Sequence, residues 1–354
     1  MRRHKVPELE VEFVNREIEF KNILELPNGR ISIIVGPKGC GKTELAKEIV
    51  YTFSEDKSKI ITLLQYRQNQ TYILSNSIRE IRQILQELYQ IIKDFSGIIG
   101  IIVNLLIDFA KILYRLVENK KILKKDLIII IDEFREIYGE DVRQVLEVES
   151  NIVRDLAMMF REYGGRLRII FMTSDATAID LLNIVGSKVD WYLMWNLDKE
   201  STFKLLDLVN CCENFDIIWL LTSGNPREIS ILKLFRWDVR RWLADKIGLV
   251  VKSILDYSRT CNKDVSDIIR EISRFLDDVD SILLSRVYDF FTKYNIVMPF
   301  DSRLRFLGKF EHSCDRCVGD FLVFQEGVYY YVLRSIVEYC SVKIDPDSVL
   351  RLVS

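Results

Sequence analysis

The sequence predicts an α/β fold: a mostly parallel sheet with helices on both faces, then a small helical lid and a further C-terminal domain. The runs at residues 31–35 and 126–131 are continuously apolar, as strands are when both faces of a parallel sheet are buried. Helical spacing alternates with such runs up to residue 197, which indicates a doubly wound arrangement. Strand signals then stop until near the C-terminus. We therefore expect domains at residues 1–197, 198–246 and 247–354.

The elements of the first domain follow from the spacing of apolar residues. Strands are predicted at residues 31–35, 59–64, 126–131, 167–172 and 189–195, and helices at 42–53, 78–92, 98–117, 142–160 and 176–184. The helix at 142–160 is expected to stop at Gly164-Gly165, because glycine readily adopts the backbone conformation that ends a helix.

The lid and the C-terminal domain are mostly helical by the same criterion. Short helices are predicted at 198–209, 215–221 and 226–235. The last has a favourable start, with Asn225 as cap, Pro226 at the first position and Glu228 at the third. Residues 320–333, DFLVFQEGVYYYVL, are expected to form two strand-like arms around a turn at Glu326-Gly327, which could be the wing of a winged helix.

Composition excludes several classes of protein. The chain has 354 residues, of which 29% are charged and 49% apolar, and 50 basic residues nearly balance 52 acidic ones. A nucleic-acid surface would therefore have to be a local patch. Seven scattered cysteines and the lack of a signal-peptide pattern predict a cytoplasmic protein. The apolar run at 95–107 is shorter than the roughly 20 residues that span a bilayer, so we expect a buried helix and no membrane span.

Residues 36–43 match the full Walker A pattern between a predicted strand and a predicted helix. The glycines allow backbone N–H groups to surround phosphates, and the helix N-terminus adds positive potential. Lys42 is expected to neutralise the β and γ phosphates, and Thr43 to bind Mg²⁺. The expected nucleotide-binding residues here are Gly36, Pro37, Lys38, Gly39, Cys40, Gly41, Lys42, Thr43 and Glu44.

Two acidic residues follow the most apolar predicted strand. Asp132 at its carboxyl end is expected to hold Mg²⁺, and Glu133 to orient and deprotonate the attacking water. After the next strand, either Thr173 or Ser174 could sense the γ-phosphate, although Ser174 and Asp175 could equally be a helix cap. A carboxylate placed like Glu133 predicts hydrolysis of the nucleotide.

Arginines offer less specific signals. Arg227, in the first turn of a lid helix, could reach the γ-phosphate and couple the nucleotide state to the lid, or could be an ordinary surface residue. An arginine finger for a neighbouring subunit could be Arg154, Arg161, Arg166 or Arg168, and none of the four is assigned.

Taken together, these motifs resemble the archaeal ATPase family, in the STAND branch of the AAA+-like P-loop ATPases. The resemblance covers about residues 13–234 and rests on FVNRE at 13–17, the Walker A loop, IIIIDEF at 128–134, RIIFMTSDATAIDLL at 168–182 and SGNPREI at 223–229. It implies that Val14 and Arg16 lie beside the adenine and ribose, and that a winged-helix module follows the lid. The SGNPR segment departs from the family's more usual Gly-Gly-x-Pro and is also similar to the sensor-2 arginine of origin-recognition and branch-migration ATPases.

Two C-terminal motifs allow more than one interpretation. Residues 232–246, LKLFRWDVRRWLADK, could follow a phosphate backbone, but an amphipathic helix with buried tryptophans and solvated charges is the preferred interpretation. His312, Cys314 and Cys317 could bind zinc or form a Cys314–Cys317 disulfide, and free thiols are preferred because a structural zinc usually takes four ligands.

The sequence thus predicts an Mg²⁺-dependent ATPase that binds ATP and ADP, with Glu133, Lys42, Thr173 and Arg227 as the catalytic set. One hypothesis is a regulatory switch whose C-terminal module binds a protein partner. The alternative is a DNA-binding ATPase related to archaeal origin-recognition proteins. A small-molecule kinase is disfavoured by the lid and the long C-terminal extension. The sequence leaves open whether the nucleotide drives oligomer formation.

Overall fold

The computed structural model describes residues 4–13, 15–67, 70–76, 120–133, 142–182 and 189–353. The helices predicted at 78–92 and 98–117, the apolar run at 95–107 and the predicted nucleotide-binding residue Val14 lie outside the described residues.

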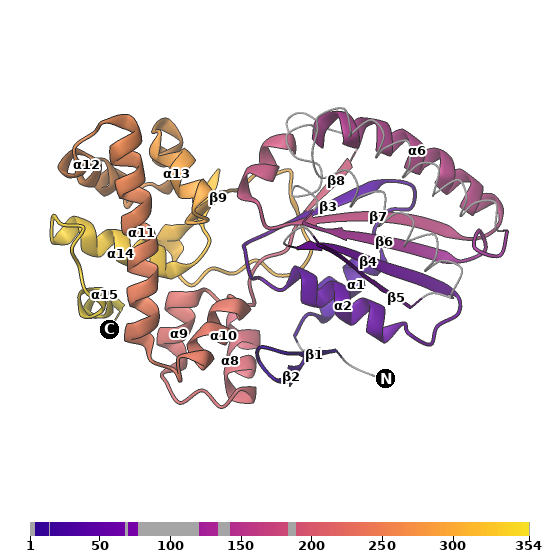
Figure 1. The fold of residues 1–354 in the computed structure, drawn as a ribbon, viewed down its shortest axis with the longest axis horizontal. Helices are drawn as coiled ribbons and strands as arrows, with labels where there is room; N and C mark the ends of the chain where they lie inside the picture. Colours follow the sequence, from indigo (N-terminus) through magenta and orange to yellow (C-terminus); the bar gives the residue numbers. More distant parts are fainter. Residues whose placement is uncertain are drawn as a thin grey trace.

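A seven-stranded sheet is the centre of the described first part of the chain (Figure 1). Its strands are β3 (Ile31–Val35), β4 (Lys59–Arg67), β5 (Gln70–Ser75), β6 (Asp126–Asp132), β7 (Arg166–Thr173), β8 (Val189–Leu193) and β10 (Arg305–Phe306), in the order β10-β8-β3-β7-β6-β4-β5. All neighbouring pairs are parallel except β4 and β5. The predicted parallel sheet is confirmed. Neither β5 nor β10 was predicted, because both lie in stretches without a continuous apolar run.

Both faces of the sheet are buried, because successive side chains of a strand point to opposite faces. On β3, Ile31 and Ile33 belong to the apolar core under helix α6 (Val142–Glu162), whereas Ile34 belongs to the core under α1 (Glu17–Leu24) and α2 (Lys42–Thr52). Figure 1 shows α6 on one face and α1 and α2 on the other. Helix α6 ends as expected at Gly164, whose φ is +86°. A 3-10 helix, η3 (Ala176–Leu181), follows β7.

The three predicted lid helices are present as α8 (Lys199–Leu208), α9 (Phe215–Thr222) and α10 (Pro226–Leu234). Asn225 caps α10, since its Oδ1 accepts the N–H of Arg227 at 3.1 Å. The next helix, α11 (Val239–Cys261), runs through the boundary predicted at residue 246. One apolar core also contains residues from both sides of that position, including Leu243 and Ile247. The predicted boundary therefore falls inside a continuous, shared structure.

The wing predicted around Glu326-Gly327 is wrong. Residues Gly327–Glu338 form helix α14, and Glu326 is its N-cap. Within it, Val328, Val332 and Ile336 recur at helical spacing and are fully buried. The only strand in this segment is β11 (Leu322–Phe324), which pairs antiparallel with β9 (Val297–Pro299) among the described residues. The run of tyrosines and valines carries strand propensity, but packing against the lid and α11 selects the helix.

The C-terminal region, residues 239–353, folds back onto the sheet. Besides α11 and α14 it contains α12 (Val265–Phe275), η5 (Val279–Leu284), α13 (Val287–Lys293), η6 (Asp315–Cys317) and α15 (Pro346–Val353). Strand β10 extends the edge of the sheet beside β8, with Phe306 opposite Leu193. The ring of Phe310 packs 4.9 Å from that of Trp195, measured between centroids. The C-terminal region is thus physically joined to the sheet that carries the glycine loop.

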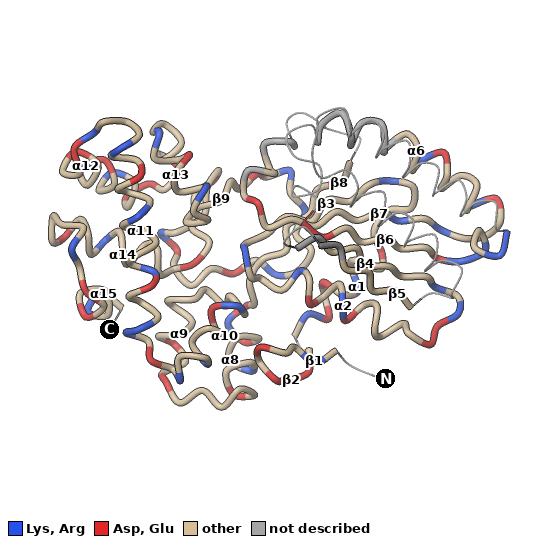
Figure 2. Tube along the Cα trace, viewed as in Figure 1, with Lys and Arg blue, Asp and Glu red and all other residues tan. Residues whose placement is uncertain are grey.

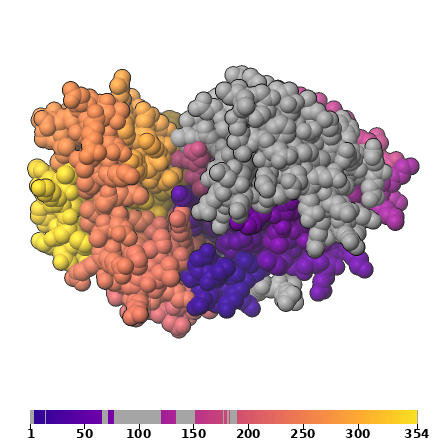
Figure 3. Space-filling model, in the orientation of Figure 1, coloured from indigo at the N-terminus to yellow at the C-terminus, as the bar shows by residue number. Residues whose placement is uncertain are grey.

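The N-terminal segment packs against the lid. Strands β1 (Lys5–Val6) and β2 (Val11–Glu12) form a small antiparallel pair, and Lys233 Nζ of α10 donates to Leu9 O at 2.7 Å. Figure 3 shows this indigo segment in contact with the lid.

Surface charge is mixed on the described chain. Figure 2 shows basic and acidic residues interspersed along the lid and the C-terminal helices. In the basic stretch at 232–246, Trp237 and Trp242 are buried. Arg240 pairs with Asp347 at 2.8 Å, and the guanidinium of Arg241 stacks on the ring of Phe235. This agrees with the preferred amphipathic interpretation. Among the described helices, none combines the length and the apolar character needed to cross a membrane.

Candidate functional site

The glycine loop lies where β3 ends and α2 begins, at the carboxyl edge of the sheet. Gly41 is the N-cap of α2 with φ +101°, and Gly39 has φ +91°, both in the left-handed region that side chains with a Cβ rarely adopt. A Cβ on Gly36 would overlap the carbonyl oxygen of Met194. These backbone requirements explain the three glycines of a loop whose shape is typical of anion-binding backbone.

Lys42 is turned onto the loop that precedes it. Its Nζ donates to Gly36 O at 2.9 Å and to Pro37 O at 3.1 Å, and the residue is 4% exposed. Carbonyl oxygens are weak partners for a buried ammonium compared with a phosphate. The side chain therefore has a stronger partner to gain when an anion enters the loop.

Oxygen ligands suited to a divalent cation meet beside the loop. Thr43 Oγ1 donates to Asp132 Oδ2 at 2.5 Å, and Gln65 Nε2 donates to the same oxygen at 3.2 Å. Asp132 ends β6 and is fully buried. Mg²⁺ prefers hydroxyl and carboxylate oxygens in this arrangement, so the residues fit the ion that the sequence predicts.

Glu133 is held by the end of the neighbouring strand. Ser174 Oγ donates to Glu133 Oε1 at 2.7 Å, and the Ser174 N–H points to Oε2 at 3.4 Å. The backbone of Glu133 has φ +56°, an unfavourable conformation for a residue with a Cβ. Thr173, the other sensor candidate, is fully buried, and its Oγ1 accepts the N–H of Asp175 at 3.1 Å. The structure thus connects Ser174, and not Thr173, to Glu133.

An apolar cavity lies beside the loop, between the N-terminal segment and the lid. It is lined by Val6, Leu9, Val11, Glu12, Phe13, Arg16, Cys40, Gly41, Glu44, Leu197, Leu205 and Pro226. Its position next to the glycine loop suits the base of a nucleotide whose phosphates lie in the loop. Phe13, Arg16, Cys40, Gly41, Glu44 and Pro226 were singled out by motif, whereas the other lining residues belong to no motif.

Arg16 lines this cavity and also holds the loop together. Its Nη2 donates to Cys40 O at 2.7 Å and to Trp195 O at 2.9 Å, and its Nη1 pairs with Glu19 at 2.5 Å. The guanidinium therefore bonds to three groups of the protein, and Arg16 also lines the cavity. Five donors on one planar group make such bridging possible.

Glu44 has two basic partners at the cavity wall. His4 Nε2 lies 2.5 Å and Lys47 Nζ 2.7 Å from its carboxylate. Burial alone would raise the pKa of Glu44, but the hydrogen bonds and charges of these partners hold it below its usual value.

The lid touches the loop through α10. A Cβ placed on Gly39 would lie 2.5 Å from Arg227 Cβ and 2.8 Å from Asn225 Oδ1. Arg227 is exposed, and no described side chain pairs with its guanidinium. The predicted arginine therefore lies against the glycine loop, and its charge also acts on the buried carboxyl of Glu326.

Other candidate groups from the sequence lie elsewhere or are occupied. Arg168 is 3% exposed and donates to Leu26 O at 2.8 Å, so it cannot reach a neighbouring subunit. No cluster that could hold a metal occurs among the His, Cys, Asp and Glu residues that the structure describes. Cys314 and Cys317 are both buried free thiols in the structure. His312 Nε2 lies 2.9 Å from Phe324 O, and burial lowers the pKa of His312 to about 4.

Several contacts around the loop could not be found from motifs. Gln65 bonds Asp132, Ser174 bonds Glu133, and Gln325 bonds the loop itself at Lys38. Gln325 is 287 positions from Lys38 in the chain, and no local pattern indicates their contact. Only Ser174 had a sequence signal, through its place after a strand next to β6.

Comparison with known proteins identifies the family of the chain. A family model described as an ATPase domain predominantly from Archaea matches residues 13–232, more than half of the chain. The search of curated proteins found no match. Among solved structures, the chain is similar to the ORC2 protein of Aeropyrum pernix in ADPNP–ADP complexes, with 12% identity over 92% of this chain and 93% of that chain and a TM-score of 0.40. It is also similar to PCH-2 of C. elegans, with 17% identity over 62% of this chain and 59% of that chain and a TM-score of 0.25.

Proposed function

The chain belongs to the family of ATPase domains found predominantly in Archaea, and from that premise we propose that it is a Mg²⁺-dependent ATP hydrolase that works as a conformational switch. The observation that carries the proposal is the meeting of three strand ends. The loop after β3 supplies Lys42 and Thr43, β6 ends in Asp132 with Glu133 following, and β7 ends beside Ser174. The direct bonds Thr43–Asp132 and Ser174–Glu133 join these groups into one site.

In the proposed site, the phosphates lie against the N–H groups of residues 39–43 and the base lies in the apolar cavity. Lys42 leaves the carbonyls of Gly36 and Pro37 to neutralise the β and γ phosphates. Glu133 takes the proton of a water molecule whose oxygen bonds to the γ-phosphorus, while the bond to the ADP oxygen breaks. The products are ADP and inorganic phosphate.

Thr43 and Asp132 are the proposed Mg²⁺ ligands. Their oxygens are 2.5 Å apart, so the carboxylate and hydroxyl already share one position beside the loop. When bound, Mg²⁺ supplies positive charge that stabilises the phosphate oxygens as the bond to the leaving group breaks. Gln65 also holds the carboxylate of Asp132, through a 3.2 Å bond to the same oxygen that accepts from Thr43.

The lid is the proposed moving part. Arg227 starts in contact with the glycine loop through Gly39, and its guanidinium is free to pair with a γ-phosphate. Loss of that phosphate removes an interaction that only the ATP state offers, which changes the relative stability of two lid positions. Because α11 joins the lid to the C-terminal region without a break, a lid movement would be passed on to that region. Of the two sensor candidates, Ser174 is the one proposed within this scheme, because its Oγ donates to Glu133, whereas Thr173 is fully buried and its Oγ1 accepts the N–H of Asp175.

The experiment compares two variants with the wild-type protein in nucleotide binding and in steady-state hydrolysis. Lys42→Ala should lose ATP binding, because the loop loses its cation. Glu133→Gln should keep ATP affinity and lose turnover, since the amide cannot accept the proton. Removing Mg²⁺ with EDTA should stop wild-type turnover. Hydrolysis by Glu133→Gln at the wild-type rate would show that Glu133 is not the base.

For the partner, we propose a protein bound through the C-terminal region. In the basic stretch at 232–246 both tryptophans are buried and Arg240 pairs with Asp347, so the stretch is occupied by packing and ion pairing within the chain. Duplex binding measured at two salt concentrations, with and without ATP, tests this choice. Affinity that falls steeply with salt would favour a DNA partner instead.

A further inference from the structure

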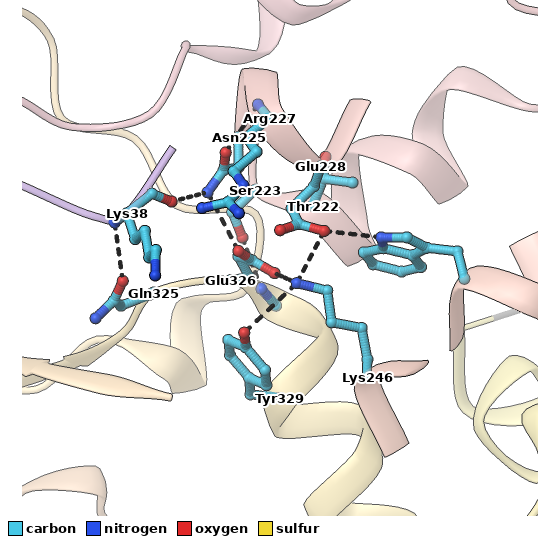
Figure 4. Close-up of polar contacts among 12 residues, drawn as sticks. Lys38, Thr222, Ser223, Asn225, Arg227, Glu228, Lys246, Gln325, Glu326 and Tyr329 are labelled. Carbon is cyan, nitrogen blue, oxygen red and sulfur yellow. Dashed lines mark hydrogen bonds and ion pairs between the residues drawn. The ribbon is translucent and has the colours of Figure 1, made fainter. Parts of the chain in front are cut away.

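Two buried amide side chains from outside the glycine loop bond to the backbone of one loop residue, Lys38. The N–H of Lys38 donates to Gln325 Oε1 at 3.2 Å, and the carbonyl of Lys38 accepts from Asn225 Nδ2 at 2.9 Å (Figure 4). Asn225 is fully buried and Gln325 is 2% exposed. Asn225 belongs to the lid, whereas Gln325 comes from the C-terminal region. The lid and the C-terminal region therefore both bond to the same residue of the loop.

Gln325 is itself fixed by its backbone. Its N–H donates to Ile296 O at 3.0 Å, and its carbonyl accepts from Asn196 Nδ2, also at 3.0 Å. Asn196 is 1% exposed and follows β8, the strand next to β3. The backbone of Gln325 is thus bound both to the C-terminal region and to the edge of the sheet that carries the loop. The side chain of Gln325 is therefore held in position to accept from Lys38 as long as the C-terminal region stays docked on the sheet.

The next residue, Glu326, contacts both the lid and helix α11. Its Oε1 accepts from Asn225 Nδ2 at 3.2 Å and its Oε2 lies 2.7 Å from Lys246 Nζ, in α11. Lys246 pairs in turn with Glu228 of α10 at 2.9 Å, and Figure 4 shows these side chains converging next to Lys38. We call Glu228, Lys246 and Glu326 the buried ion cluster. It joins the starts of α10 and α14 to the middle of α11.

Fixing Lys38 matters because a glycine-rich loop is costly to order. Gly39 and Gly41 populate many backbone conformations, and binding phosphates requires one in which successive N–H groups converge. Each hydrogen bond that holds the loop before the nucleotide arrives reduces the ordering cost at binding. An interaction made equally in the ground state and the transition state changes affinity and leaves kcat nearly unchanged.

We propose that Gln325 is a positioning residue of the nucleotide site, which preorganises the glycine loop through Lys38 while the C-terminal region is docked. This inference rests on the proposed nucleotide-binding function of the loop. It makes nucleotide affinity dependent on a residue of the C-terminal region, and by reciprocity makes docking of that region stronger when nucleotide is bound.

The test is Gln325→Met in the full-length protein, because methionine keeps the length of the side chain and removes the acceptor. ADP affinity should fall about threefold to tenfold, the value of one neutral hydrogen bond, while kcat at saturating ATP stays within about twofold of wild type. Hydrogen exchange without nucleotide should become faster at the Lys38 amide and stay unchanged in α14.

The matched control is Asn22→Ala. It removes a bond from Asn22 Nδ2 to Leu307 O, at 2.7 Å, which ties the same C-terminal region to the sheet domain away from the loop. ADP affinity and Lys38 exchange should stay at wild-type values. Unchanged ADP affinity and Lys38 exchange in Gln325→Met, or an equal loss in Asn22→Ala, would overturn the proposal. If the wild-type protein bound no adenine nucleotide, the proposed function would fail, and Lys38 exchange alone would still decide whether Gln325 holds the loop.

Discussion

Replacing Lys246 by methionine tests how the buried ion cluster holds the lid to the C-terminal region. Lys246 is 8% exposed, and its Nζ lies 2.9 Å from Glu228 and 2.7 Å from Glu326. It also lies 5.3 Å from the ring centre of Trp242. Methionine fills nearly the same volume, so the substitution removes the charge while largely keeping the packing.

The expected loss follows from the two carboxylates left behind. Removing one partner of a buried ion pair costs about 3 to 5 kcal/mol, because the remaining charge has neither water nor a counter-ion. We expect the lower end, about 3 kcal/mol at neutral pH. Burial and the neighbouring Glu228 already raise the pKa of Glu326 to about 8, so this carboxyl can stay neutral. Glu228 keeps the hydrogen bond from Trp242 Nε1 at 2.8 Å.

The pH dependence gives a second, independent signature. Because the pKa of Glu326 is raised from 4.5 to about 8, its contribution to stability is complete below pH 4.5 and is lost as pH rises through about 8. Without Lys246, which lowers that pKa, the loss continues above pH 8, at up to about 1.4 kcal/mol per pH unit. The difference between variant and wild type should therefore be nearly constant below about pH 8 and grow above it.

The assay is urea unfolding followed by tryptophan fluorescence at several pH values. The control is Lys204→Met, which removes an exposed lysine paired with Glu200 at 2.6 Å and should unfold like wild type. The double variant Glu228→Gln/Lys246→Met should recover part of the loss, since one buried charge is removed with its partner. Equal unfolding midpoints for Lys246→Met and Lys204→Met, with the same pH dependence, would refute the account of the cluster.

Two further predictions concern the site itself. Ser174→Ala should lower kcat about tenfold or more with little change in ATP affinity, because the hydroxyl that holds Glu133 is lost. The control Ser174→Thr keeps a hydroxyl and should retain activity. Faster turnover in Ser174→Ala would contradict this prediction. Gly39→Ala and Gly41→Ala each place a Cβ on a residue in the left-handed region, which costs about 1 to 2 kcal/mol of stability. Only the Cβ of Gly39→Ala would also overlap the side chain of Arg227. Thermal unfolding without nucleotide should show the larger loss for Gly39→Ala, and equal losses would mean that the lid does not press on the loop.

The sequence could predict the site wherever the chemistry depends on neighbours in the chain. The Walker A loop needs glycines at fixed backbone positions, and Asp132 and Glu133 need only the end of a buried strand. The same reasoning could not choose between Thr173 and Ser174. That choice depends on which of two adjacent side chains faces Glu133 across the β6–β7 pair, and the structure brings Ser174 to it.

The C-terminal region shows the opposite case. The segment around Glu326-Gly327 has strand propensity, yet it begins α14 because its valines and tyrosines are buried against α11 and the lid. Strand β10 is two residues long and forms only because the edge of β8 is available to it. Neither outcome is written in a local pattern, since each depends on what the rest of the chain places alongside.

By itself, the sequence determined the parallel sheet, the glycine loop on its carboxyl edge and the acidic pair that follows β6, because apolar periodicity and glycine geometry act over a few residues. Only the tertiary structure decided that Asn225 and Gln325 hold Lys38, and that Lys246 sits between Glu228 and Glu326. Those contacts join residues far apart in the chain. They exist because the C-terminal region folds back onto the sheet, and burial then favours hydrogen-bonded partners for the polar groups there.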